Sequence, residues 1–243
     1  MTDRAMTDTT LTSLLSGNVE HVESLTADDF RDVLDEQHPS FVSMCCADSR
    51  VSQEGMWATD RPGQVFTPSN IGNQVWDADV GERIVDGSIL YPIHYCGTET
   101  IVIVGHTGCG AVSAAYDVAR GGPEPGPLGV TKWVDLLVPV IDDGLADERI
   151  DADPDGTPRG VDEATVVDQL VEYNVEVQVD FLRDAPEVPE DVSIYGFVYD
   201  VHGRFGGASG RAYLVNLDGT TDPEAIADQV PDDYHDAVRS LIH

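Results

Sequence analysis

Short apolar runs that read as β-strands alternate along the chain with segments whose apolar residues recur at helical spacing. The strand-like runs lie at residues 41–44, 64–67, 101–104 and 194–201, and the helical patterns cover residues 109–122, 128–143 and 163–184. Parallel strands need a long crossover between them, which is usually a helix. The alternation therefore predicts an α/β fold with a mainly parallel central sheet flanked by helices.

The two ends of the chain differ from this pattern. Residues 1–36 are polar and acidic with scattered apolar positions, and we predict an N-terminal helical arm there, followed by a single α/β domain over residues 37–243. Within residues 128–143, Pro139 is expected to kink or end the helix. Near the C-terminus, residues 211–219 ("RAYLVNLDG") follow the glycine-rich segment 202–210, which predicts an antiparallel edge strand. The sequence suggests no role for segment 202–210 itself.

The charge balance of the chain is extreme. The 243 residues include 45 acids and 13 bases, which gives a formal net charge of −32, and Lys132 is the only lysine. Nucleic acid and anionic membranes are therefore excluded as partners. Because the acids are spread over almost every polar segment rather than gathered in a tail, we predict a solvated surface adapted to high salt, as in halophilic proteins. At about 1 M salt the Debye length is only about 3 Å, which screens such self-repulsion.

Two features of the sequence favour a cytoplasmic protein. No N-terminal stretch shows a basic region followed by an apolar one, and no apolar run approaches the roughly 20 residues that span a bilayer. The chain has four cysteines, two of them adjacent, which does not resemble a secreted disulfide framework. In a cytosolic protein these cysteines indicate metal binding or catalysis.

Polar residues follow two of the predicted strands, in "FVSMCCADSR" (41–50) and "IVIVGHTGCG" (101–110). Ligands of parallel sheets bind beyond the carboxyl ends of the strands, so we expect these two strand ends to meet. Cys46, His106 and Cys109 would then supply two thiolates and an imidazole, a ligand set that favours Zn²⁺, one ion per chain. Three protein ligands leave a fourth position open, which is typical of catalytic zinc sites.

The other two cysteines are expected to be buried, small apolar residues. Adjacent residues of a strand point to opposite faces, so Cys45 should not reach an ion bound by Cys46. For Cys96 burial as a small apolar residue is the simplest interpretation.

Asp48 and Arg50 follow the first ligand by two and four residues. The simplest interpretation is a salt bridge in a loop. Beside a zinc site, however, the arginine would fix the carboxylate, leaving one oxygen to accept a hydrogen bond from zinc-bound hydroxide or to bind the metal itself.

These residues resemble the beta-class carbonic anhydrases. The likeness rests on "CADSR" (46–50) and "GHTGCG" (105–110), and it continues through residues 63–73, 88–97 and 195–201, so that it covers residues 37–201. It implies a zinc-dependent enzyme for the reversible hydration of carbon dioxide to bicarbonate. Zinc-bound hydroxide would be the nucleophile, oriented by Asp48 and Arg50. The resemblance also implies a homodimer or tetramer in which N-terminal helices embrace the neighbouring chain.

Further assignments follow from the same resemblance. We assign Gln37 and Gly110 to substrate binding, Gln37 because some family members carry a glutamine at this interval before the ligand cysteine. His38 and His202 are candidates for the proton shuttle. The chain departs from the family at Ser69, where an arginine is usual, and in segment 202–210, which is longer than the usual turn.

Three alternatives share the same residues. A related hydrolase of carbon disulfide or carbonyl sulfide could use the same zinc ligands. A structural zinc module would not need Asp48 and Arg50 beside an open metal position. A pure thiol switch would not need a histidine among the ligands.

Overall fold

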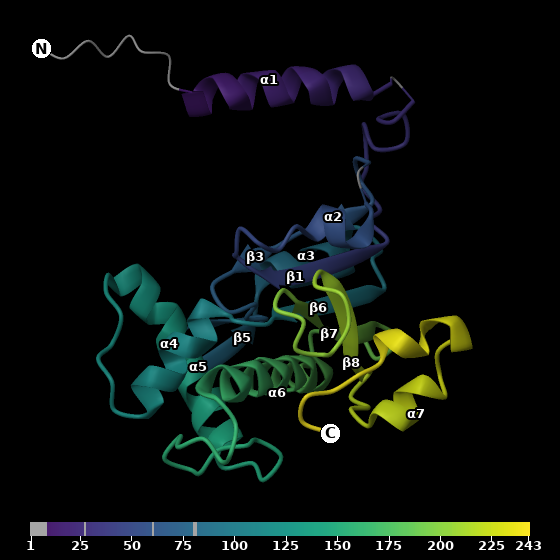
Figure 1. Cartoon of the computed structure of the whole chain (residues 1–243). Helices are drawn as coiled ribbons and strands as arrows, with labels where there is room; N and C mark the ends of the chain where they lie inside the picture. Colours follow the sequence, from purple (N-terminus) through teal and green to yellow (C-terminus); the bar gives the residue numbers. More distant parts are fainter. Residues whose placement is uncertain (1–8, 27, 60, 80–81) are drawn as a thin grey trace, which may run out of the picture.

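A six-stranded sheet lies at the centre of the molecule (Figure 1). The computed structural model describes residues 9–243 except 27, 60 and 80–81. The strands follow the order β2-β1-β6-β7-β8, and β3 also pairs with β1. Their bounds are Phe41–Cys46 (β1), Val65–Phe66 (β2), Ser69–Asn70 (β3), Thr100–His106 (β6), Ser193–Asp200 (β7) and Arg211–Leu217 (β8).

All pairings in this sheet are parallel except the last. β1 runs parallel to β2, β3 and β6, and β6 runs parallel to β7. β8 pairs antiparallel with β7 at the edge of the sheet. The predicted α/β fold with a mainly parallel sheet and an antiparallel edge strand is confirmed.

The main core lies between one face of the sheet and a layer of four helices. These are α3 (Gly87–Tyr95), α4 (Gly110–Ala119), α5 (Leu128–Leu145) and α6 (Glu163–Asp184). Helix α6 packs on β6 and β7, where two strand residues are glycines. A Cβ atom would come within 2.9 Å of Val175 at Gly105 and within 2.7 Å of the same valine at Gly196. Glycine at these positions lets the helix approach the sheet closely.

Helix α5 does not end at Pro139 but continues to Leu145. The residues beyond the proline include Val140, Ile141 and Leu145, which are all buried in the main core. Their burial offsets the hydrogen bond that proline removes.

The opposite face of the sheet is only partly covered. Helix α2 (Gln53–Trp57) packs there, with the Trp57 ring edge-on to Phe197 at a centroid distance of 5.1 Å. Helix α7 (Pro223–Ala227) and the 3₁₀-helix η1 (Asp232–Ala237) contact β8. The sequence patterns did not predict the hairpin of β4 (Trp76–Asp79) and β5 (Glu82–Val85), nor helices α3 and α7.

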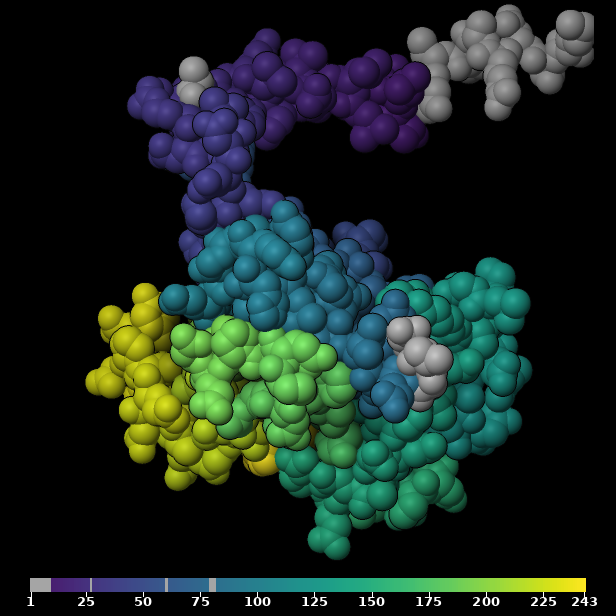
Figure 2. All heavy atoms as spheres, turned by 180° about the vertical axis from the view of Figure 1, so that it is seen from behind, coloured from purple at the N-terminus to yellow at the C-terminus, as the bar shows by residue number. Residues whose placement is uncertain are grey.

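The N-terminal helix α1 (Thr9–Ser24) stands clear of the sheet and of the other helices (Figures 1 and 2). Its apolar residues Leu14, Leu15, Val19 and Val22 are all exposed, at 56–68%. Among the residues that the structure describes, no helix has the length and apolar character needed to cross a membrane.

Candidate metal centre

Cys46, His106 and Cys109 lie together at the carboxyl ends of two neighbouring strands. Cys46 ends β1, His106 ends β6, and Cys109 is the N-cap residue of α4. One ligand atom from each residue lies within 4.8 Å of the others, and the two Sγ atoms are 3.8 Å apart. All three side chains are buried.

This cluster fits a zinc ion on two counts. His106 Nε2 is buried and has no hydrogen-bond partner among the described residues, which is costly for a polar atom unless a further ligand binds it. Two thiols and one imidazole are also the donor set that zinc prefers. The residues present therefore match the cofactor that the sequence predicts.

The surroundings of Cys46 favour a thiolate. The hydrogen bond with Cys109 and the nearby imidazole of His106 lower the pKa of Cys46, against the opposing effect of burial. The backbone N–H of Gly72 also donates to Cys46 Sγ at 3.4 Å. A thiolate is the form of cysteine that binds metal.

Cys45 faces away from the cluster. It packs with Val102 and Val104 on the opposite face of the sheet, and burial raises its pKa to about 12, so it remains a neutral thiol. Cys96 is likewise buried, at 3% exposed. Both cysteines behave as small apolar residues, as their positions in the sequence predicted.

Asp48 and Arg50 form a bidentate pair beside the cluster. Arg50 donates from Nε to Asp48 Oδ1 at 2.9 Å and from Nη2 to Oδ2 at 2.7 Å. This guanidinium holds the pKa of Asp48 well below its usual range. Asp48 Oδ2 lies 3.6 Å from His106 Nε2, so the ionised carboxylate borders the position that a metal would occupy.

A cavity of about 330 Å³ is lined by Asp48 and by one residue of the cluster, Cys46. Its remaining lining residues are Ala47, Val51, Ser52, Gln53, Glu54, Thr67 and Ser69. Ser69, the position at which the sequence departs from the expected family pattern, thus lies in the wall of this cavity.

The other predicted site residues lie outside the three-residue cluster. Gly110 is the first residue of α4, and no atom lies within 4 Å of the position a Cβ would take. Gln37 is exposed in the segment before β1, and within the described part of the chain no hydrogen bond joins it to the cluster. The two histidines are apart from each other: His38 bonds the Cys96 carbonyl at 3.0 Å, and His202 Nδ1 bonds Thr107 Oγ1 at 3.0 Å.

Two buried amides of α6 support the cluster, and the sequence reasoning missed both. Asn174 Nδ2 donates to the carbonyl of Gly72 at 3.3 Å, and Gln178 Oε1 accepts from the N–H of Val75 at 2.8 Å. Both side chains are fully buried. The sequence feature that could have revealed them is a pair of amide residues, four positions apart, on the valine-rich face of a predicted helix. Such amides would be buried, and buried amides need hydrogen-bond partners.

Comparisons with known proteins agree with this geometry. Residues 41–205 match the family model described as carbonic anhydrase. A carbonic anhydrase of Pseudomonas aeruginosa is 28% identical over 189 residues, which make up 75% of this chain and 79% of that protein.

Solved structures resemble the whole fold. The Coccomyxa beta-carbonic anhydrase in complex with acetazolamide superposes with a TM-score of 0.67 at 25% identity, covering 93% of this chain and 95% of that one. One of two tetrameric beta-carbonic anhydrases from Sordaria macrospora has a TM-score of 0.64 at 21% identity, covering 86% of this chain and 97% of that one.

Proposed function

Because the chain belongs to the beta class of the carbonic anhydrase family, we propose that it catalyses the reversible, zinc-dependent hydration of carbon dioxide to bicarbonate and a proton. One observation carries the proposal. Two cysteines and a histidine converge within 4.8 Å of one another directly beside an ionised Asp–Arg pair. A purely structural zinc site would have no use for that pair.

Cys46, His106 and Cys109 would hold the zinc ion. When bound, zinc supplies a Lewis acid that makes hydroxide available as a nucleophile near neutral pH. Three protein ligands are the number typical of catalytic zinc sites, and Asp48 Oδ2 lies 3.6 Å from His106 Nε2, next to the place the ion would take.

Asp48 acts in this proposal as a fixed hydrogen-bond acceptor. Its carboxylate is ionised near neutral pH, because Arg50 holds the pKa of Asp48 well below its usual range. Arg50 also determines which way the two oxygens point, since it donates to both. Asp48 can therefore orient the attacking oxygen, and the two hydrogen bonds from Arg50 restrain the carboxylate from binding the metal itself.

Gly110 and Gln37 are proposed to contact the substrate. Gly110 borders open space immediately after Cys109, so a small molecule can approach the backbone there. Gln37 lies exposed on the segment that joins α1 to β1. We infer that it contributes to the site only in the assembled homo-oligomer.

We infer a homodimer or tetramer in the cytoplasm. The exposed apolar stripe of α1 needs a partner surface, and a second copy of the chain is the simplest one. All four cysteines are free, which suits a reducing compartment.

The test combines elemental analysis of zinc with a stopped-flow assay of carbon dioxide hydration. We expect one zinc per chain and hydration that disappears when a chelator removes the metal. Stoichiometric zinc without hydration would favour a structural module instead. Turnover of carbon disulfide or carbonyl sulfide, without hydration of carbon dioxide, would identify the related hydrolase.

A further inference from the structure

We propose that Asp168 of α6 is a positioning residue that fixes the Asp48–Arg50 pair through Gly108, and that segment 202–210 anchors Asp168 through Arg204. The inference rests on the proposed function, because it concerns the same site. It assigns roles to an acid of α6 and to the glycine-rich segment that the catalytic scheme leaves unexplained.

Gly108 is held on both of its sides. Its N–H donates to Asp168 Oδ1 at 2.6 Å, and its carbonyl accepts from Arg50 Nη2 at 3.1 Å. It adopts a φ of +65°, and a Cβ at this position would collide with the ring of His202. Gly108 lies between His106 and Cys109, and its carbonyl is the third acceptor of Arg50 besides the two oxygens of Asp48. The position of this carbonyl therefore affects the position of the Arg50 guanidinium.

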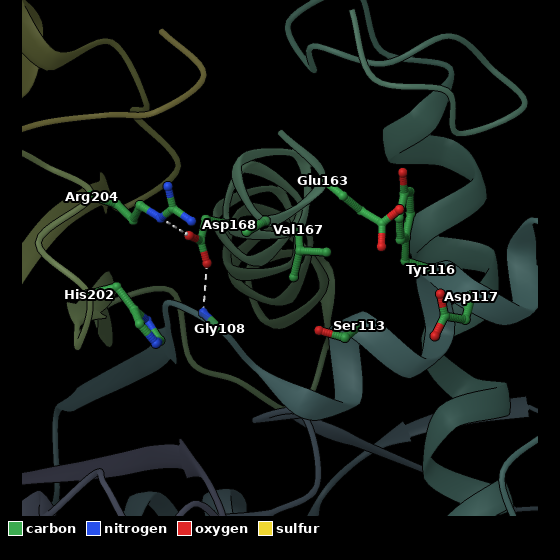
Figure 3. A pocket seen from close by; sticks show the side chains of 10 residues that line it. Gly108, Ser113, Tyr116, Asp117, Glu163, Val167, Asp168, His202 and Arg204 are labelled. Atoms are coloured by element: carbon green, nitrogen blue, oxygen red, sulfur yellow. Dashed lines mark hydrogen bonds and ion pairs between the residues drawn. The ribbon is translucent and has the colours of Figure 1, made fainter. Parts of the chain in front are cut away.

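Asp168 is in turn fixed by Arg204 (Figure 3). Its side chain is almost fully buried, and Arg204 Nε lies 3.0 Å from its Oδ2. The two carboxylate oxygens therefore have separate partners, one toward Gly108 and one toward Arg204. Gly108, Asp168 and Arg204 also line a cavity of about 320 Å³ (Figure 3).

Hydrogen bonds at the start of segment 202–210 fix the backbone that carries Arg204. The buried Asp200 accepts hydrogen bonds from the N–H groups of Arg204 and Phe205, both at 3.0 Å. Thr107 Oγ1 accepts from the N–H of Val201 at 2.9 Å and from the N–H of His202, the first residue of the segment, at 3.2 Å. The start of the segment is thus bonded both to the end of β7 and to the loop that carries Gly108.

Together these contacts form a continuous chain of bonded groups. It runs from Arg204 through Asp168 and Gly108 to Arg50, and from Arg50 to Asp48. Groups that orient the residues around a metal commonly affect activity by 10- to 100-fold when they are removed. Asp168 should therefore influence catalysis although it does not touch the substrate.

The first experiment compares three variants of the full-length zinc protein. Asp168→Ala removes the acceptor for Gly108, and we expect kcat/KM for hydration to fall by about tenfold or more with zinc content unchanged. Asp168→Asn keeps an acceptor oxygen for Gly108 but turns an NH2 group toward Arg204, so its kcat/KM should lie between those of the parent and of Asp168→Ala. Asp180→Ala, an exposed acid on the same helix, is the matched control and should leave kcat/KM unchanged.

A double-mutant cycle then separates positioning from general destabilisation. If Asp168 acts through Arg50, the double variant Asp168→Ala/Arg50→Lys should lose no more activity than the worse of the two single variants. Fully additive losses would overturn the proposal, as would an Asp168→Ala variant with parental kcat/KM. Melting temperatures, measured in parallel, identify any variant that fails to fold.

A readout independent of turnover uses the protein loaded with Co²⁺. Asp168→Ala and Arg50→Lys should change its visible absorption spectrum in the same way, because both loosen the carboxylate beside the metal. Asp180→Ala should not change the spectrum, and an Asp168→Ala spectrum identical to that of the parent would contradict the inference. If the parent hydrates no carbon dioxide, the proposed function fails, and the cobalt spectrum still tests the positioning role.

Discussion

At the scale of single residues, Cys45 and Cys46 offer a direct test of the metal site. They are adjacent, yet Cys46 joins His106 and Cys109 whereas Cys45 packs against Val102 and Val104 on the other face. We expect Cys46→Ser to lose zinc and hydration activity, because a serine hydroxyl does not ionise to replace a thiolate. Cys45→Ser, the matched control, should keep its zinc and most of its activity, at some cost in stability. Elemental analysis decides, and equal zinc loss in both variants would refute the assignment.

At the scale of elements, α6 carries a buried acid whose protonation should affect stability. Glu172 is fully buried and accepts from Ser240 Oγ and, at 2.7 Å, from the N–H of Leu241. Burial raises its pKa from 4.5 to about 7. The folded state therefore favours the protonated form, so this group's contribution to stability is present below pH 4.5 and is lost as the pH rises through about 7.

Glu172→Gln should remove this pH dependence, because the amide does not titrate. We expect the free energy of unfolding of the variant, relative to the parent, to increase between about pH 5 and pH 8, by at most about 3 kcal/mol. Urea denaturation across this pH range measures the difference. The exposed Glu187→Gln serves as control, and a difference that does not vary with pH would show that Glu172 is not the group responsible.

At the scale of the whole molecule, the net charge of −32 should make stability depend on salt. Carboxylates spread over the surface repel one another, and the Debye length falls from about 10 Å at 0.1 M salt to about 3 Å at 1 M. We expect the melting temperature to rise steeply between these concentrations of potassium chloride, and dilution to dissociate or unfold the protein. Sodium chloride should act similarly if screening is the cause. An unchanged melting temperature would count against a salt-adapted surface.

Much of the fold and of the candidate metal centre could be predicted from the sequence, because the relevant information is local. Apolar runs alternating with helical patterns predicted the parallel sheet, and a period of two along β1 placed Cys45 and Cys46 on opposite faces. Polar residues directly after two strands predicted that Cys46, His106 and Cys109 would meet, since parallel strands end at the same edge. Asp48 and Arg50 were predictable as a pair because they are two residues apart.

Only the tertiary structure decided what supports that centre. Asp168 and Gly108 are 60 residues apart, and Asn174 and Gly72 are 102 residues apart, so no spacing in the sequence connects them. These contacts exist because α6 packs closely on β6 and β7, where glycines allow its approach. The course of α5 through Pro139 was likewise decided by burial of the residues beyond it, which outweighs a local preference of the chain.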